Sequence, residues 1–196
     1  SKIIKSGNSS SMSGSMNNIF ENTFAKTVGA KFGVTFNSGT STLHAALHAL
    51  DVGYGDEVIV PALTVIADLN VILAQNAIPV FADIDPRTFN IDPNDIERKI
   101  TRKTKAIIVV PLYGLPCEYD HIKKISKKYG VSVINDAAQS PLAEYKGSPI
   151  ASLFDITSFS FDATKHITTG DGGMITTNNK KTATKIRKFG CLGYKA

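Results

Sequence analysis

The chain has 196 residues and a formal net charge of +5, and 42% of its residues are hydrophobic and 20% charged. This length supports one domain, because compact domains usually have ~100 to 200 residues, and the composition excludes intrinsic disorder, collagen and coiled coils. The positive charge suits a phosphorylated ligand. The densest basic groups, at 123–128 and 180–188, have helical spacing, so we interpret them as solvated helix faces and expect no nucleic-acid partner.

Residues 1–17 are rich in serine, glycine and asparagine, which predicts a flexible lead-in before a folded domain over 18–196. These residues lack the apolar core of a secretion signal, and no apolar run approaches the ~20 residues of a membrane span. We therefore expect a cytoplasmic protein without a membrane partner.

The cysteines and histidines do not form a metal-binding pattern. Cys117 and Cys191 have no companion at metal-ligand or CxxC spacing, so buried or free thiols are predicted. His44 and His48 could share a helix face, but the segment lacks the glutamate of HExxH and an obvious third ligand. We therefore predict no metal site.

Strands and helices alternate along most of the sequence. A first helix is predicted from Asn18 to Gly29, which would close it as a C-cap. Runs of β-branched and aromatic residues then predict strands at 32–36, 57–61, 78–83, 105–111 and 131–136, separated by helices at 41–50, 64–75, 93–100 and 118–129. Two further strands, 156–161 and 174–177, precede a last helix over 180–189. This order predicts one α/β domain with a mainly parallel sheet and helices on both faces.

Polar residues just after each strand are the candidates for chemistry, because ligands of open α/β sheets bind beyond the carboxyl ends of the strands. Residues 37–41 follow one strand and open a helix. Gly39 allows a tight turn, and Thr40 and Ser41 can cap the helix, whose free N–H groups favour a phosphate. The alternative is an ordinary N-cap. The sequence has neither a GxxxxGK[ST] nor a GxGxxG motif, so a monophosphate fits better than a nucleotide.

A carboxylate ends the strand at 131–136. Asp136 would point into the cleft, Ala137 and Ala138 leave room for a flat ring, and Gln139 can bond a ring substituent. The alternative is a turn or capping aspartate.

A lysine lies in the loop between the last two strands. If Lys165 lies among apolar residues, its charged form is disfavoured and the free amine can form a Schiff base. A solvated loop lysine is the alternative. Residues 61–65 follow another strand, and a side chain there could cover a bound ring, although packing explains this segment equally well.

An anion site, a carboxylate, an amide and a Schiff-base lysine are together what pyridoxal phosphate (PLP) requires. An aspartate opposite the pyridine nitrogen keeps the nitrogen protonated, and the lysine anchors the cofactor and moves the proton.

The sequence resembles the sugar-nucleotide aminotransferases of the DegT/DnrJ/EryC1/StrS family, which have the aspartate aminotransferase fold. The resemblance runs from about Ser13 to Gly190 and rests on NSGTSTLHAAL, GDEVIVPALT, PVFADID, VVPLYGLPCEYD, VINDAAQS and SFSFDATKHITTGDGG. It implies that Lys165 carries the cofactor, Asp136 pairs with the pyridine nitrogen, and Gln139 contacts the ring hydroxyl. The phosphate would be held by Thr40, Ser41 and Ser160. The implied reaction moves an amino group, usually from glutamate, to a keto sugar linked to a nucleotide.

The sequence departs from the family at several positions. Val65 stands where an aromatic residue usually stacks on the cofactor, and Asp162 and Asp171 replace a usual His or Gln and a usual Glu. Family members also continue past the last helix into a segment that reaches the partner subunit's phosphate and into a small C-terminal domain. We therefore expect a homodimer, and a chain that lacks that domain.

Two rival interpretations remain open. Relatives that dehydrate sugars replace the lysine with histidine, and Lys165 argues against that activity. The chain could also be a noncatalytic folding or dimerisation module, since the family's C-terminal segment is missing from it.

Overall fold

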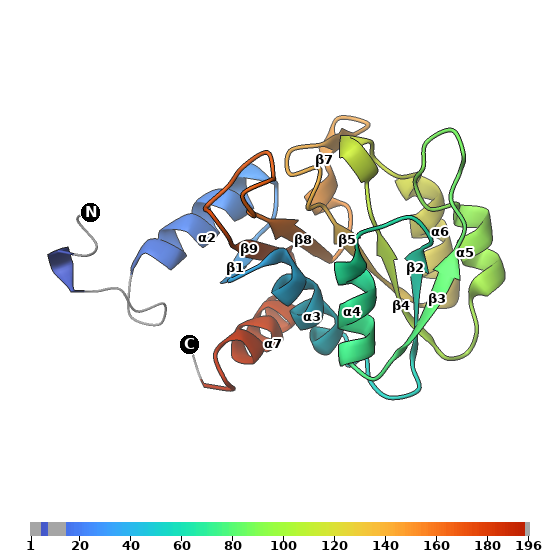
Figure 1. The fold of residues 1–196 in the computed structure, drawn as a ribbon, viewed down its shortest axis with the longest axis horizontal. Coiled ribbons are helices and arrows are strands. Elements are labelled where there is room, and N and C mark those ends of the chain that lie inside the picture. Colours follow the sequence, from blue (N-terminus) through green and yellow to red (C-terminus); the bar gives the residue numbers. More distant parts are fainter. Residues whose placement is uncertain (1–4, 8–14, 195–196) are drawn as a thin grey trace.

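The computed structural model of the chain describes residues 5–7 and 15–194. A seven-stranded sheet has the order β1-β9-β8-β5-β4-β2-β3 (Figure 1). Strands β3, β2, β4, β5 and β8 pair in parallel, and β9 is antiparallel to both of its neighbours, which confirms a mainly parallel sheet. The strands are β1 (Phe32–Phe36), β2 (Glu57–Pro61), β3 (Ile78–Ala82), β4 (Thr104–Val109), β5 (Ser132–Asp136), β8 (Ile156–Ser160) and β9 (Gly173–Thr177).

Helices cover both faces of this sheet, as the alternation of strands and helices predicts. Val58 and Val60 of β2 belong to one hydrophobic core with α3, α4 and α7, whereas Ile59 between them belongs to a second core with α2, α5 and α6. Side chains of a strand point alternately to its two faces, so buried parallel strands need apolar residues at every position. The helices are α2 (Ser15–Thr27), α3 (Gly39–Ala49), α4 (Ile66–Ala74), α5 (Pro93–Lys99), α6 (Tyr119–Tyr129) and α7 (Lys180–Gly190).

Some element boundaries differ from the sequence prediction. Helix α2 begins at Ser15 and not at Asn18, while residues 1–4 and 8–14 of the expected lead-in lie outside the described residues. Helix α4 begins at Ile66, because Val65 is extended with φ −77° and ψ 144°. Strand β4 ends at Val109, and a 3-10 helix (Leu112–Gly114) follows.

The segment after β5 contains a hairpin that the sequence analysis does not predict. Its strands β6 (Glu144–Tyr145) and β7 (Ser148–Pro149) are only two residues long, and a short 3-10 helix (Ile150–Ser152) follows. The turn residues Lys146 and Gly147 have φ of 52° and 75°, the positive values that two-residue hairpin turns require.

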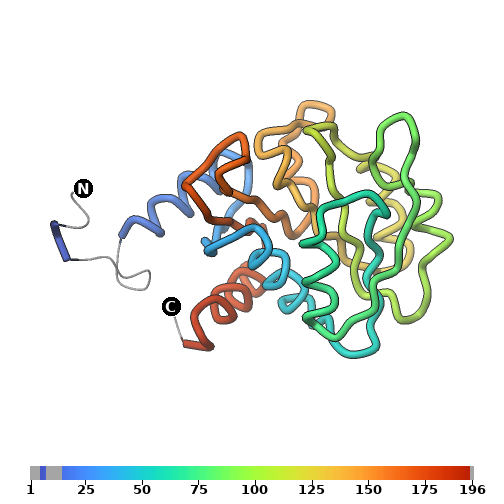
Figure 2. Tube along the Cα trace, viewed as in Figure 1, coloured from blue at the N-terminus to red at the C-terminus, as the bar shows by residue number. Residues whose placement is uncertain are grey.

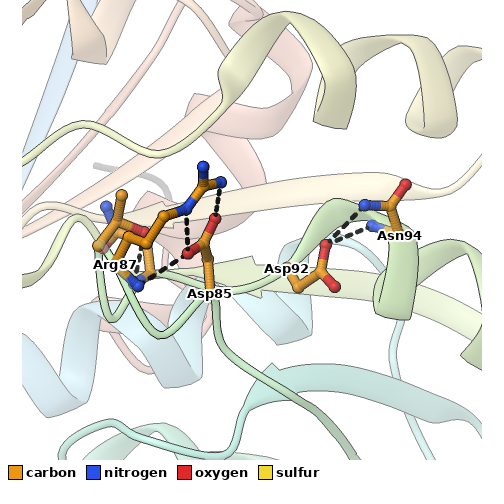
Figure 3. A network of polar contacts seen from close by, with 6 residues as sticks. Asp85, Arg87, Asp92 and Asn94 are labelled. Carbon is orange, nitrogen blue, oxygen red and sulfur yellow. Dashed lines mark hydrogen bonds and ion pairs between the residues drawn. The ribbon is translucent and has the colours of Figure 1, made fainter.

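The loop between β3 and α5 is held by two local polar contacts (Figure 3). Arg87 donates from Nε and Nη2 to the two oxygens of Asp85, at 3.1 and 2.6 Å. Asp92 caps α5 by accepting from the backbone N–H of Asn94 at 2.9 Å. The ion pair of Arg87 and Asp85 lies at the surface and adds little stability.

Two further sequence predictions outside the site, those for the basic groups and for the cysteines, are confirmed. The two basic groups lie on α6 and α7, and both cysteines are free thiols, with Cys117 buried. His44 and His48 of α3 pack against the ring of Phe189. Within the described part of the chain, no helix is both long and apolar enough to span a membrane.

Candidate active site

Six of the eight residues that the sequence predicts for the site line a cleft of about 220 Å³. It lies where β5 and β8 end, which is the edge of the sheet where ligands of this fold class bind. Two larger hollows, of about 520 and 530 Å³, contain none of the eight. The cleft is lined by Ser38, Gly39, Thr40, Leu43, Val65, Ala67, Asp136, Ala138, Ser160, Asp162, Lys165 and Asp171.

The start of α3 forms one wall of the cleft. Ser38 is the N-cap, and its Oγ accepts from the N–H of Ser41 at 3.1 Å. Ser41 in turn donates its hydroxyl to Asn37 at 2.7 Å, and it is not among the lining residues. The helix is therefore capped by Ser38, and the expectation that Thr40 and Ser41 cap it is wrong. Thr40 and the N-terminal end of the helix border the cleft.

Position 39 requires glycine, because the start of α3 lies very close to β8 there. A Cβ atom at this position would lie 2.8 Å from the Cβ of Ser160. Any larger residue would push Ser160 away from the start of α3. The result is a helix N-terminus with a serine hydroxyl beside it, and such an end attracts anions because its N–H groups are unpaired within the helix.

Asp136 ends β5 and is 2% exposed. Its Oδ1 accepts from the N–H of Ala138 at 3.1 Å, which is the local contact expected of a turn aspartate. Burial raises the pKa of Asp136 to about 6, although the Ala138 N–H and the positive charge of Lys165 act in the opposite direction. Asp136 therefore stabilises the turn after β5 and also lines the cleft.

Lys165 lies half-buried in the loop between β8 and β9, and its N–H donates to the carbonyl of Asp162 at 3.0 Å. The apolar surroundings expected for Lys165 are found in part, because the cleft is lined both by apolar residues, such as Leu43 and Val65, and by Asp136, Asp162 and Asp171. Sequence alone indicated the loop but not which side chains converge on it.

The loop that carries Lys165 is held by hydrogen bonds within it and by ring contacts to α2. The carbonyl of Phe161 accepts from the N–H of Thr169 at 3.0 Å, and Asp162 accepts from the N–H and the hydroxyl of Thr164. Figure 2 shows this loop beside α2, where the ring of Phe161 contacts Phe20 and Phe24. These contacts fix the position of the lysine.

Gln139 and Val65 have different placements. Gln139 accepts from the N–H of Tyr113 at 2.9 Å and lines a separate hollow with Gly114, His166 and Ile167, so the structure does not bring it into the cleft. Val65 does line the cleft and is 43% exposed.

Asp68 is a buried carboxyl group that the sequence analysis overlooks. It lies on α4 and is 0% exposed, and one of its oxygens accepts a hydrogen bond from the hydroxyl of Thr64. Burial and the neighbouring Asp136 raise the pKa of Asp68 well above its usual range. Its spacing from Val71 and Ile72, three and four residues later on the buried face of α4, is the signal that could have identified it.

A helix N-terminus, an amine and a buried carboxyl around one cleft can hold an anionic ligand and exchange a proton with it. A lysine amine in its unprotonated form can also bond covalently to a carbonyl carbon. Asp136 has a raised pKa and lines the cleft, which marks it as a candidate functional group.

Comparison with known proteins identifies relatives of the same architecture. The chain is 50% identical over 151 residues to the GDP-perosamine synthase of Caulobacter vibrioides, a match that covers 77% of this chain and 41% of that protein. The solved aminotransferase from Psychrobacter cryohalolentis superposes with a TM-score of 0.92 and 39% identity, covering 94% of this chain and 47% of that chain. NtdA from Bacillus subtilis, solved with bound cofactor PMP, superposes with a TM-score of 0.89 and 35% identity, covering 96% of this chain and 42% of that chain.

The chain spans about two fifths of the length of the curated relatives it matches. The family model of the DegT/DnrJ/EryC1/StrS aminotransferases matches residues 1–196. Sequence, fold and this match agree, and the chain belongs to the DegT/DnrJ/EryC1/StrS aminotransferase family.

Proposed function

We propose that this chain is the cofactor-binding part of a PLP-dependent aminotransferase that moves an amino group from glutamate to a keto sugar linked to a nucleotide. The observation that carries the proposal is the cleft in which Lys165 faces the buried carboxyl of Asp136 beside the start of α3. The names of the relatives support the substrate class, since one is a GDP-perosamine synthase. The product would be an amino sugar for polysaccharide synthesis.

The residues of the cleft fit PLP. A Cβ at Gly39 would fill the space between α3 and Ser160, so this glycine keeps the N-terminus of the helix open for a phosphate. Thr40 and Ser160 would add hydroxyl donors from two sides, and Ser41 would act through the helix cap. Asp136 would accept a hydrogen bond from the ring nitrogen, and Gln139 would need to leave Tyr113 to reach the ring hydroxyl.

PLP, when bound, supplies an electron sink for the pair of electrons released as a substrate Cα loses its proton. Asp136 would hold the ring nitrogen protonated, because its negative charge favours the cationic form of that nitrogen. The amine of Lys165 would hold the cofactor through its carbonyl carbon, with loss of water, and when free it would carry the proton at the substrate carbon.

The neighbouring histidine does not support sugar dehydration as an alternative activity. His166 lies on the separate hollow with Gln139, whereas Lys165 lies on the cleft. A histidine at the lysine's place would need the loop to shift by one residue. The hydrogen bonds of Phe161 and Asp162 within the loop oppose that shift.

Homodimerisation and a cytoplasmic location are parts of the same proposal. Apolar side chains beside the site support a partner subunit: Leu142 is 59% and Ile167 40% exposed, and both line the hollow next to the cleft. Burying such a patch would stabilise a dimer. Sedimentation of the purified chain measures its oligomeric state.

The absorbance spectrum of the chain with PLP tests the proposed function. We expect a new band that disappears on borohydride reduction, and peptide mass spectrometry should then locate the cofactor on Lys165. The matched control is His166→Ala, which should keep the band. No band, or an adduct spread over surface lysines, would support the noncatalytic interpretation and overturn the proposal.

A further inference from the structure

Asp68 has no role in the proposed reaction, although it is a fully buried ionisable group beside the cleft. Its Oδ2 accepts a hydrogen bond from the hydroxyl of Thr64, at the end of the loop after β2. Its Oδ1 is buried and has no donor among the described residues. A buried acceptor without a donor is costly, so this oxygen requires an explanation.

The explanation lies in the neighbouring carboxyl group. The carboxyl groups of Asp68 and Asp136 lie close enough for each to shift the pKa of the other. An ionised carboxyl group has acceptors only, so two carboxyl groups can bond to each other only when one of them carries a proton. Two buried carboxylates in contact also cannot both ionise, since like charges disfavour each other there. The pair therefore holds one proton and one negative charge.

The surroundings of each group indicate where the proton resides. Asp136 accepts from the N–H of Ala138 and faces the positive charge of Lys165, and both favour its ionised form. Asp68 accepts a hydrogen bond from the neutral hydroxyl of Thr64, and no positively charged side chain of the described residues acts on it. The proton therefore belongs on Oδ1 of Asp68. A protonated Oδ1 donates a hydrogen bond itself, which explains why no donor faces it.

We propose that Asp68 is a positioning residue, which carries a proton and donates it in a hydrogen bond to Asp136. With the Ala138 N–H on the other side, this bond fixes the orientation of the Asp136 carboxylate and limits the pair to one negative charge. The statement that this carboxylate then meets a ring nitrogen rests on the proposed function. The proton on Asp68 does not depend on it.

The elements around the pair carry other ionisable side chains, of which Lys165 acts on Asp136. Lys165, Asp162 and Asp171 line the cleft on the side of Asp136. Helix α3, which packs against α4, contributes His44 and His48, whose rings rest on Phe189.

Two substitutions of nearly equal size separate a donor from a space-filling group. Asp68→Asn keeps an N–H donor toward Asp136, whereas Asp68→Leu has none. The first measurement uses the chain without cofactor, labelled with carboxyl-¹³C aspartate. At neutral pH we expect the infrared carbonyl band of a protonated aspartic acid in the unsubstituted chain and in the control Asp51→Asn, whose carboxyl is on the surface. The band should be missing in Asp68→Asn, and its persistence there would overturn the assignment of the proton.

The second measurement is the affinity for PLP, read from its absorbance. Asp68→Asn should bind within about threefold of the unsubstituted chain, and Asp68→Leu about tenfold or more weakly, because a hydrogen bond to a charged group is lost. Equal affinity of the two variants would overturn the positioning role. Should the leucine variant fail to fold, as judged by circular dichroism, Asp68→Val replaces it. If the unsubstituted chain binds no PLP, the proposed function fails, and the infrared comparison still decides whether Asp68 carries the proton.

Discussion

Gly39 at the start of α3 lies against Ser160 at the end of β8, so closely that a Cβ on the glycine would come within 2.8 Å of the serine Cβ. This contact brings the N-terminus of a helix and a hydroxyl from a strand to one wall of the cleft. Residues 121 positions apart in the sequence thus form one anion site, because β8 lies next to β9, which pairs with the strand before α3.

Gly39→Ala should displace Ser160 and weaken PLP binding about tenfold or more, while the overpacked contact costs roughly 1–3 kcal/mol of unfolding free energy. Cofactor titration and urea unfolding measure the two effects. The matched control is Gly53→Ala, since nothing lies within 4 Å of a Cβ at that position. If the alanine at position 39 left binding unchanged, the phosphate would have to bind elsewhere.

Lys165→Ala should abolish covalent attachment of PLP and leave the fold intact, because a loop lysine contributes little to core packing. Mass spectrometry after borohydride reduction reports the adduct, and thermal unfolding reports the fold. An adduct that survives on another lysine would contradict the role given to this loop.

The fold was predictable because its strands are short, apolar on both faces and separated by amphipathic helices. Strands β1 and β2 have the bounds that their β-branched residues predict. The positions of Asp136 and Lys165 on the cleft could be predicted from the rule that ligands bind at the strand ends, and their roles stay predictions. The β6–β7 hairpin was missed because its two-residue strands show no periodicity.

Contacts between side chains of different elements could not be predicted in this way. Helical spacing places Asp68 on the buried face of α4, but only the fold brings it to Asp136 on β5. Gln139 follows a strand, and yet its side chain turns to Tyr113, because the direction of a turn residue depends on the backbone around it. The three aspartates that line the cleft with Lys165 likewise come from two segments, the end of β5 and the loop between β8 and β9.

The buried carboxyl pair predicts how stability depends on pH. Burial raises the pKa of Asp136 from 3.8 to about 6 and raises that of Asp68 as well. Above about pH 4 the folded chain therefore holds more protons than the unfolded chain, so the unfolding free energy falls as the pH rises, through about pH 6 for Asp136 and beyond it for Asp68, to which we assign a proton at neutral pH. A shift of two pKa units corresponds to about 3 kcal/mol. Urea unfolding measures the unfolding free energy at pH 5 and at pH 8. Its decrease from pH 5 to pH 8 should be smaller for Asp136→Asn than for the unsubstituted chain, and equal decreases would argue against the pair.

Val65 lines the cleft at the position where the family usually has an aromatic residue. It is 43% exposed, so a ring at this position would meet the cleft and not the core. An aromatic contact adds about 0.5 to 1.5 kcal/mol beyond the area that it buries. Val65→Phe should therefore bind PLP roughly two- to tenfold more tightly, because about 1.4 kcal/mol corresponds to a factor of ten. Leu63→Phe is the matched control, since Leu63 is 42% exposed but does not line the cleft, and its affinity should not change. Fluorescence titration of both variants measures this difference. Weaker binding by the Val65 variant would mean that this cleft is shaped around valine and that the ring lies elsewhere than the family resemblance implies.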